Sequence, residues 1–109
     1  MRLALALLAL AACQSSDVSR SIGARCDLSA ECDDRCLVDA TAWPGGFCSL
    51  TCDTNEQCDH GVCIQEQGGG VCAFTCGSDP DCAFLGAGYG CKARDGHTGG
   101  LKVMACRGD

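Results

Sequence analysis

Apolar residues are unevenly distributed along the chain, and the one long apolar run lies at its start. Leu3 to Ala12 form ten consecutive Leu and Ala residues, preceded by Met1 and the positively charged Arg2. A helix needs about 20 apolar residues to cross a bilayer, so this run is too short to span one. Its length and its flanks are typical of the apolar region of a secretory signal. We therefore predict a signal peptide over residues 1–12.

A polar segment separates this run from the rest of the chain. Residues 14–25 read QSSDVSRSIGAR and show no hydrophobic period. Clusters of Ser, Gly and charged residues are typical of loops and linkers. We therefore expect a flexible tether over residues 13–25.

Beyond residue 25 the runs of apolar residues are short and scattered, which favours strands and turns over helices. In the middle of the chain, residues 61–65 and 71–75 form two candidate strands of one hairpin. Glycines in the connecting residues 66–70 can supply the positive φ that a tight turn requires. Helix is expected over no more than about one turn near residues 29–36 or 79–85.

Cysteine spacing divides this part of the chain into three similar modules. There are 13 cysteines among the 109 residues, well above the roughly 8–10% that indicates a disulfide scaffold in a short chain. Twelve of them fall into three sets of four, and each set opens with a gap of five residues. The sets are Cys26, Cys32, Cys36 and Cys48; Cys52, Cys58, Cys63 and Cys72; and Cys76, Cys82, Cys91 and Cys106. We place module 1 at 26–50, module 2 at 51–74 and module 3 at 75–109.

The repeat extends beyond the cysteines. Residues 45–52 read GGFCSLTC and residues 69–76 read GGVCAFTC, an offset of 24 residues, and a weaker copy closes module 3 at 99–106. A Glu, Gln or Asp precedes the second Cys of each set, at positions 31, 57 and 81. Agreement at this many positions indicates duplicated modules.

These modules contain few large apolar residues with which to build a core. After residue 25 there are one Trp, one Tyr and three Phe, so covalent links must supply stability. Each disulfide typically contributes about 2–4 kcal/mol, mainly by restricting the unfolded chain. The predicted fold class is a small disulfide-rich protein of three short four-Cys modules, with β-hairpins and little helix.

Metal binding is the alternative use of so many cysteines. Structural zinc sites usually contain Cys-x2-Cys knuckles, and no two cysteines here have that spacing. The histidines, His60 and His97, stand in loops rich in Gly and Asp. Calcium could use the oxygens of Asp53, Asn55, Glu56 and Asp59, although clustered acids are usually a solvated face and the chain has no EF-hand pattern. We expect neither a metal nor another cofactor.

The end of the apolar run, Leu10-Ala11-Ala12-Cys13, resembles a bacterial lipobox. The resemblance implies cleavage before Cys13, diacylglycerol on its sulfur, and an acyl chain such as palmitate on the new N-terminus. Gln14 in place of Asp implies export to the outer membrane or cell surface. With Cys13 lipidated, twelve cysteines remain, an even number that can form six disulfides.

The spacing Cys-x5-Cys-x3–5-Cys, followed by a Gly-aromatic-Cys step, resembles the cysteine-rich lipoproteins of myxobacteria. It resembles more loosely the N-terminal region of Dickkopf proteins and EGF-like modules. By analogy with the latter, each module is expected to pair its first Cys with the third and its second with the fourth, as Cys52–Cys63 and Cys58–Cys72 in module 2. Bridges between modules stay open, and the resemblance says nothing about activity.

The sequence favours a non-catalytic binding or structural module over an enzyme. It contains no Gly-x-Ser-x-Gly, His-Glu-x-x-His or phosphate-binding loop, and its acids are scattered over loops. The alternative is a disulfide-stapled protease inhibitor or toxin-like ligand. The terminal Arg107-Gly108-Asp109 is interpreted as a chance tripeptide.

Charge and exposed apolar residues indicate where a partner would bind. Residues 26–76 carry nine acids and one base, whereas residues 77–109 carry four of each. Such acidity disfavours nucleic acid and anionic lipid as partners. Module 3 carries six large apolar residues (Phe84, Leu85, Tyr89, Leu101, Val103 and Met104). Either they fill a small core of that module, or some form a partner surface, for which Phe84 and Tyr89 are the candidates; the partner itself is an unknown protein or envelope component.

Overall fold

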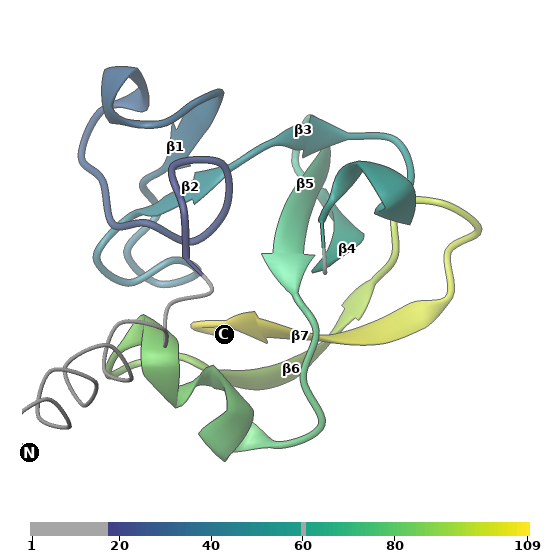
Figure 1. Cartoon of the computed structure of the whole chain (residues 1–109). Helices are drawn as coiled ribbons and strands as arrows, with labels where there is room; N and C mark the ends of the chain where they lie inside the picture. The colour runs from purple at the N-terminus through teal and green to yellow at the C-terminus, as the bar shows by residue number, and fades with distance from the viewer. Residues whose placement is uncertain (1–17, 60) are drawn as a thin grey trace, which may run out of the picture.

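A computed structural model describes residues 18–59 and 61–109 of the chain. The predicted signal peptide, Cys13 and His60 lie outside these residues. The described part consists of short antiparallel strands, three short 3-10 helices and the loops between them (Figure 1).

Each module places one 3-10 helix before one β-hairpin. Module 1 has η1 (Ser29–Glu31), β1 (Arg35–Leu37) and β2 (Phe47–Ser49), and module 2 has η2 (Asn55–Gln57), β4 (Gly61–Glu66) and β5 (Gly69–Phe74). Module 3 has η3 (Asp79–Leu85), β6 (Gly90–Asp95) and β7 (Lys102–Arg107). A further short strand, β3 (Thr51–Cys52), pairs with β5, so the middle sheet has the order β3-β5-β4. The hairpin predicted in module 2 is confirmed, with a turn shorter than expected.

The twelve cysteines of the modules form six disulfides, and every bond closes within its own module. The bonds are Cys26–Cys36 and Cys32–Cys48, Cys52–Cys63 and Cys58–Cys72, and Cys76–Cys91 and Cys82–Cys106. Each module thus pairs its first cysteine with its third and its second with its fourth, the pattern that the EGF-like resemblance implied. The fold is the small disulfide-rich scaffold that the sequence predicts. Because disulfides persist in oxidising compartments, these bonds indicate an extracellular or cell-envelope protein.

Hairpin register explains why the same pairing recurs. The third and fourth cysteines stand opposite each other in every hairpin, as Cys36 and Cys48, Cys63 and Cys72, and Cys91 and Cys106 do. Instead of bonding to each other, they bond to the first two cysteines of the module, which flank the 3-10 helix in modules 1 and 2, whereas in module 3 the second of them, Cys82, lies within η3. Two adjacent bonds therefore fasten each helix to its hairpin.

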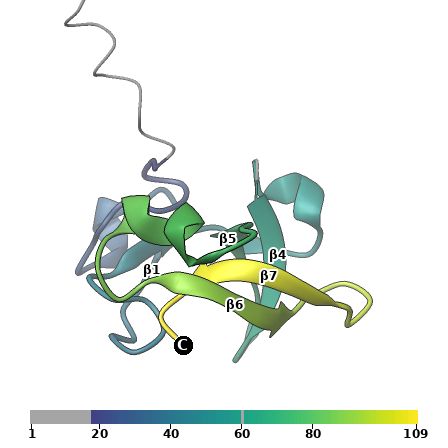
Figure 2. The same cartoon turned by 90° about the horizontal axis from the view of Figure 1, so that it is seen from below.

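The hydrophobic core is shared by the three modules rather than divided among them. Phe47 of module 1 is fully buried and lies 4.7 Å from Trp43, 6.1 Å from Phe74 of module 2 and 6.3 Å from Tyr89 of module 3, measured between ring centroids. One continuous cluster of buried residues runs from Ile22 to Cys106. The described residues therefore form one domain, with a small aromatic centre and six disulfides. Figure 2 shows the strands and 3-10 helices of the three modules gathered side by side.

Polar contacts join the modules as well. The hydroxyl of Ser49 in module 1 is buried, donates to the carbonyl of Cys72 at 2.9 Å and accepts from the amide of Cys72 at 3.0 Å. Arg107 in module 3 is only 7% exposed, and its guanidinium binds both carboxylate oxygens of Glu66 in module 2 at 2.9 and 3.0 Å. The same guanidinium lies 5.4 Å from the centroid of the Trp43 ring in module 1. A buried arginine thus connects all three modules.

The flexible tether predicted over residues 13–25 is wrong for residues 18–25. Ile22 is 4% exposed and belongs to the core, and the amide of Gly23 donates to the carbonyl of Cys48 at 2.8 Å. Gly23 has a φ of +99°, and a Cβ there would lie 2.7 Å from the Phe74 ring. A glycine is therefore needed for this segment to lie across Phe74. The single Ile gave no periodic signal, which is why the sequence pattern missed this contact.

Candidate functional site

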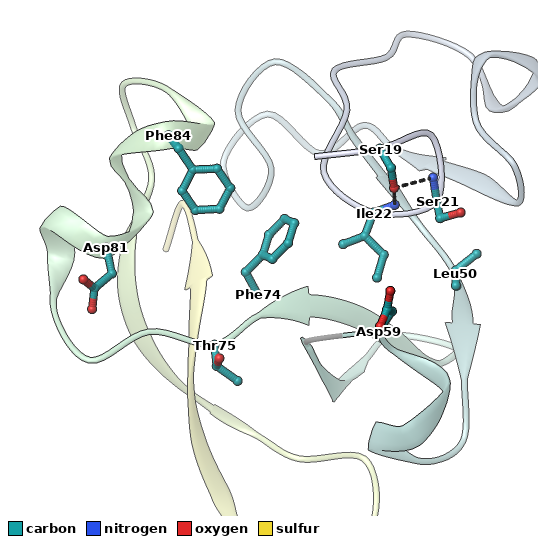
Figure 3. A pocket seen from close by; sticks show the side chains of 9 residues that line it. All are labelled: Ser19, Ser21, Ile22, Leu50, Asp59, Phe74, Thr75, Asp81 and Phe84. Atoms are coloured by element: carbon teal, nitrogen blue, oxygen red, sulfur yellow. Dashed lines mark hydrogen bonds between the residues drawn. The ribbon is translucent and has the colours of Figure 1, made fainter. Parts of the chain in front are cut away.

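A groove of about 430 Å³ opens where the N-terminal segment crosses the boundary between modules 2 and 3 (Figure 3). Its wall on one side is η3, its floor is the end of β5, and its other wall is the segment around residues 19–22. Leu50 and Asp59 complete the lining. The lining residues are Ser19, Ser21, Ile22, Leu50, Asp59, Phe74, Thr75, Asp81 and Phe84. We call this the Phe84 groove.

Two aromatic side chains form the apolar part of the Phe84 groove. Phe84 stands edge-on to Phe74, with ring centroids 5.1 Å apart and an angle of 75° between the planes. Phe74 is buried, whereas Phe84 remains 45% exposed. An aromatic ring this exposed beside a recess offers a contact surface that the fold itself does not use.

The polar part of the groove carries negative charge. Asp59 and Asp81 line it, and the described residues of its lining include no Lys, Arg or His. The Asp81 carboxylate accepts hydrogen bonds from the amides of Gly77 and Ser78 at 2.8 and 3.0 Å, which fixes it at the start of η3. The groove therefore combines an aromatic wall with a carboxylate, that of Asp81, which backbone hydrogen bonds hold in place.

Of the two residues predicted to form a partner surface, the structure places only Phe84 in this groove. Tyr89 packs against Phe47 and is half-buried, and this burial raises the pKa of its phenol to about 12. Leu85 is also buried, while Leu101 and Met104 are exposed. The large apolar residues of module 3 therefore divide between core and surface.

The acidic and amide side chains before the second cysteines have a structural role that the sequence analysis missed. In each module the oxygen of this side chain accepts hydrogen bonds from two successive backbone amides at the start of the 3-10 helix. Glu31 binds the amides of Asp27 and Leu28 at 2.7 and 3.0 Å, and Gln57 binds those of Asp53 and Thr54 at 2.5 and 3.0 Å. These two bonds hold the pKa of the Glu31 carboxyl below its usual 4.5.

A second side chain in each module binds the hairpin. In module 1 the Ser29 hydroxyl accepts a hydrogen bond from the Cys36 amide at 3.1 Å. The corresponding bonds run from the Cys63 amide to Asn55 at 2.9 Å in module 2, and from the Cys91 amide to Asp79 at 2.8 Å in module 3. The signal was present in the sequence, because these residues all stand three positions after the first cysteine of their set.

One of the calcium ligands considered above, Asn55, uses its side-chain oxygen to accept a hydrogen bond from the Cys63 amide at 2.9 Å. The groups of three ligand atoms within 4.8 Å found in the described part of the chain are cysteine triplets, one per module. Every one of those sulfurs is in a disulfide, so none has a thiolate to give to a metal.

His97 and the terminal tripeptide also make internal contacts. His97 Nδ1 lies 2.6 Å from Gln65 Oε1, and its amide donates to the carbonyl of Cys63 at 2.9 Å. The buried Arg107 is bound by Glu66 and by Asp109 of the tripeptide itself. The tripeptide is therefore not presented on an open loop.

Compared with protein-family models, curated proteins and solved structures, the chain matches none. None of the helices in the described part of the chain has the length and apolarity to cross a membrane.

Proposed function

We propose that this protein is a lipid-anchored component of the bacterial outer membrane or cell surface, with the lipid on Cys13. The observation that carries the proposal is the pairing of the cysteines. The twelve module cysteines bond to one another within their modules, so none of them is left as a partner for Cys13. The residues Leu10-Ala11-Ala12 before Cys13 supply the lipobox pattern that would direct acylation to this sulfur.

The folded domain in this proposal is a non-catalytic binding or structural module. The Phe84 groove offers apolar and acidic contacts to a partner, and the described residues that line it include no histidine or thiol. Six disulfides and a shared core hold the residues around the groove in place. Such a scaffold supports binding because little ordering remains to be done when a partner arrives.

The anchor is tested by the intact mass of the full chain expressed in a Gram-negative host. We expect the protein in the detergent-extracted membrane fraction, beginning at Cys13 and carrying two or three acyl chains. One chain binds membranes only marginally, and a second makes anchoring stable. Cys13→Ser should abolish both processing and acylation, whereas Ser15→Ala, a matched change two residues away, should leave the mass of the acyl groups unchanged.

Two results would count against the anchor. A wild-type chain recovered in the soluble fraction with residues 1–12 intact contradicts it. Alkylation of any of the twelve module cysteines in the folded protein also contradicts it, because a free module thiol would be available to form a disulfide with Cys13.

A further inference from the structure

One disulfide of module 3 is more open to solvent than the other bonds. Among the six disulfides of the described residues, Cys76–Cys91 is the only one in which both cysteines are partly exposed. In module 1 Cys36 is partly exposed but its partner Cys26 is buried, and the remaining four bonds each join two buried cysteines. A thiolate breaks a disulfide by direct attack on one of its sulfurs, so access to the bond limits the rate. Cys76–Cys91 therefore offers the easiest approach to an external thiol.

The distribution of charge also favours attack on module 3. The attacking species is a thiolate and is therefore negatively charged. Residues 26–76 carry nine acids and one base, whereas residues 77–109 carry four of each. Module 3 therefore repels an incoming thiolate less than the two modules before it do.

The sulfurs of module 3 place a second disulfide next to the exposed one. The Sγ atoms of Cys76, Cys82 and Cys106 all lie within 4.8 Å of one another. Cys82 and Cys106 are bonded to each other and are both fully buried, so an external thiol has no direct access to their bond. A thiolate formed at Cys76 would lie beside both of its sulfurs. In modules 1 and 2 the corresponding group contains one sulfur of the buried bond rather than both.

Both bonds of module 3 fasten η3 to the β6–β7 hairpin. Cys82 lies within η3 and Cys76 just before it, whereas their partners Cys91 and Cys106 lie in β6 and β7. The same short helix carries Phe84, which forms one wall of the Phe84 groove (Figure 3). If both bonds open, this wall is held by non-covalent contacts alone.

We propose that Cys76–Cys91 is a site of thiol–disulfide exchange with an external dithiol, and that its opening is passed on to Cys82–Cys106 and releases η3. In the first step one thiolate of the dithiol attacks a sulfur of Cys76–Cys91, forms a mixed disulfide and expels the other cysteine as a thiolate. The second thiol of the dithiol then breaks the mixed disulfide. The dithiol leaves as a disulfide, and its two electrons and two protons stay on the two cysteines.

The transfer to the buried bond is an exchange in which one disulfide breaks and one forms. The Cys76 thiolate attacks Cys82 or Cys106, and the other cysteine of that pair leaves as a thiolate. The new bond includes the partly exposed Cys76, so a second molecule of dithiol reduces it by the same two steps. The proposal goes beyond the lipid anchor and does not depend on it.

Timed reduction of the full chain with dithiothreitol tests the site. Free thiols are trapped with iodoacetamide at each time point, and the alkylated cysteines are identified by mass spectrometry of the digested chain. We expect Cys76 and Cys91 to be alkylated first, at least about tenfold faster than any cysteine of modules 1 and 2, because access limits the rate. Cys82 and Cys106 should follow. A sample without dithiothreitol gives the background.

Two single variants test the transfer to the buried bond. Cys91→Ser and Cys76→Ser both remove the exposed bond and leave one free thiol, but only Cys91→Ser keeps the sulfur that lies beside Cys82–Cys106. Dithiothreitol should open Cys82–Cys106 at least about tenfold faster in Cys91→Ser than in Cys76→Ser. A bond with a purely structural role predicts equal rates, because both variants lose it. The fluorescence of the buried Trp43 checks that each variant is folded.

Hydrogen exchange tests the release of η3. Once the two bonds of module 3 have opened, amides of residues 77–90 should exchange at least about tenfold faster than in the oxidised chain, with a smaller change in residues 26–66.

Four outcomes would overturn the proposal. They are the opening of another bond before Cys76–Cys91, the opening of all six bonds in one step, equal rates in the two serine variants, and unchanged exchange in residues 77–90. If a serine variant does not fold, the wild-type time course decides, because Cys82–Cys106 must then open after Cys76–Cys91 and before the bonds of modules 1 and 2.

Discussion

At the residue scale, Phe84 and Tyr89 show how similar side chains in one module acquire different roles. Both are aromatic, both lie in module 3, and they are five positions apart in the sequence. Tyr89 packs on Phe47 of module 1, a residue 42 positions earlier, whereas Phe84 meets Phe74 at the edge of the groove. The sequence pattern could identify the pair but could not separate them, because the distinction depends on contacts between modules.

Burial of Tyr89 has a consequence for pH dependence. The loss of solvent around the phenol raises its pKa from 10.0 to about 12, with the positive charge of Arg25 acting in the opposite direction. The unfolded chain therefore releases this proton at a lower pH than the folded chain does. The stabilisation is fully present below pH 10 and is lost as the pH rises from 10 to about 12.

We expect the absorbance of phenolate at 295 nm to titrate near pH 12 in the folded protein, measured within seconds of a pH jump. The reduced, denatured chain should titrate near pH 10. Tyr89 is the one tyrosine in the sequence, so the signal is unambiguous. A folded-state titration near pH 10 would instead show an exposed phenol and would return Tyr89 to the partner surface.

At the element scale, the three modules repeat one arrangement of helix, hairpin and hydrogen-bonding side chain. The hairpin of module 2 could be predicted because short apolar stretches flank a run of glycines. The hairpin of module 1 could not, since its strands have three residues each and a nine-residue connection separates them. Of the 3-10 helices, η1 and η3 were foreseen as about one turn each and η2 was not foreseen, because the side chains that stabilise them bind backbone amides and leave no hydrophobic period.

The side chain that caps η2 can be exchanged between modules in a test. Gln57→Ala removes the acceptor for the amides of Asp53 and Thr54, and we expect a loss of about 0.5–2 kcal/mol in the free energy of unfolding at pH 7. Gln57→Glu reproduces the residue found at position 31 and should cost less than about 0.5 kcal/mol. Denaturant unfolding with the disulfides intact measures both.

The control for this exchange is Glu56→Ala, a change to an exposed neighbour in the same short helix. It should alter the unfolding free energy by less than about 0.5 kcal/mol, as surface substitutions usually do. If Glu56→Ala and Gln57→Ala lower the unfolding free energy equally, the hydrogen bonds to the Gln57 side chain contribute no particular stability.

At the scale of the whole molecule, the sequence predicted the covalent frame better than the core. Cysteine spacing indicated three modules, and the disulfides do close within each of them. The same spacing contains no information on how the modules pack. Trp43, Phe47, Phe74 and Tyr89 come from all three modules, and Ile22 comes from the predicted tether, yet they join one core. Cysteines define the modules, but the scarce large apolar residues join them into a domain.

The buried Arg107 is the polar counterpart of that shared core, and its removal should destabilise the packing of the modules. Its side chain is 8% exposed, and the paired Glu66 side chain is 18% exposed. Arg107→Met leaves the Glu66 carboxylate poorly solvated and without its partner. We expect a loss of about 2–4 kcal/mol in unfolding free energy, somewhat below the value for a fully buried pair because Glu66 keeps some contact with water.

Trp43 lies beside the Arg107 guanidinium, so its fluorescence during guanidinium denaturation measures this loss directly. The double variant Arg107→Met with Glu66→Met should lose less than the sum of the two single variants, because no unpaired carboxylate remains. The control is Lys102→Met, which breaks the exposed pair with Asp95, whose side chains are 70% and 58% exposed. Its cost should stay below about 1 kcal/mol, as is usual for surface ion pairs. If Arg107→Met costs no more than Lys102→Met, the arginine does not hold the modules together, and the other contacts between modules must do so.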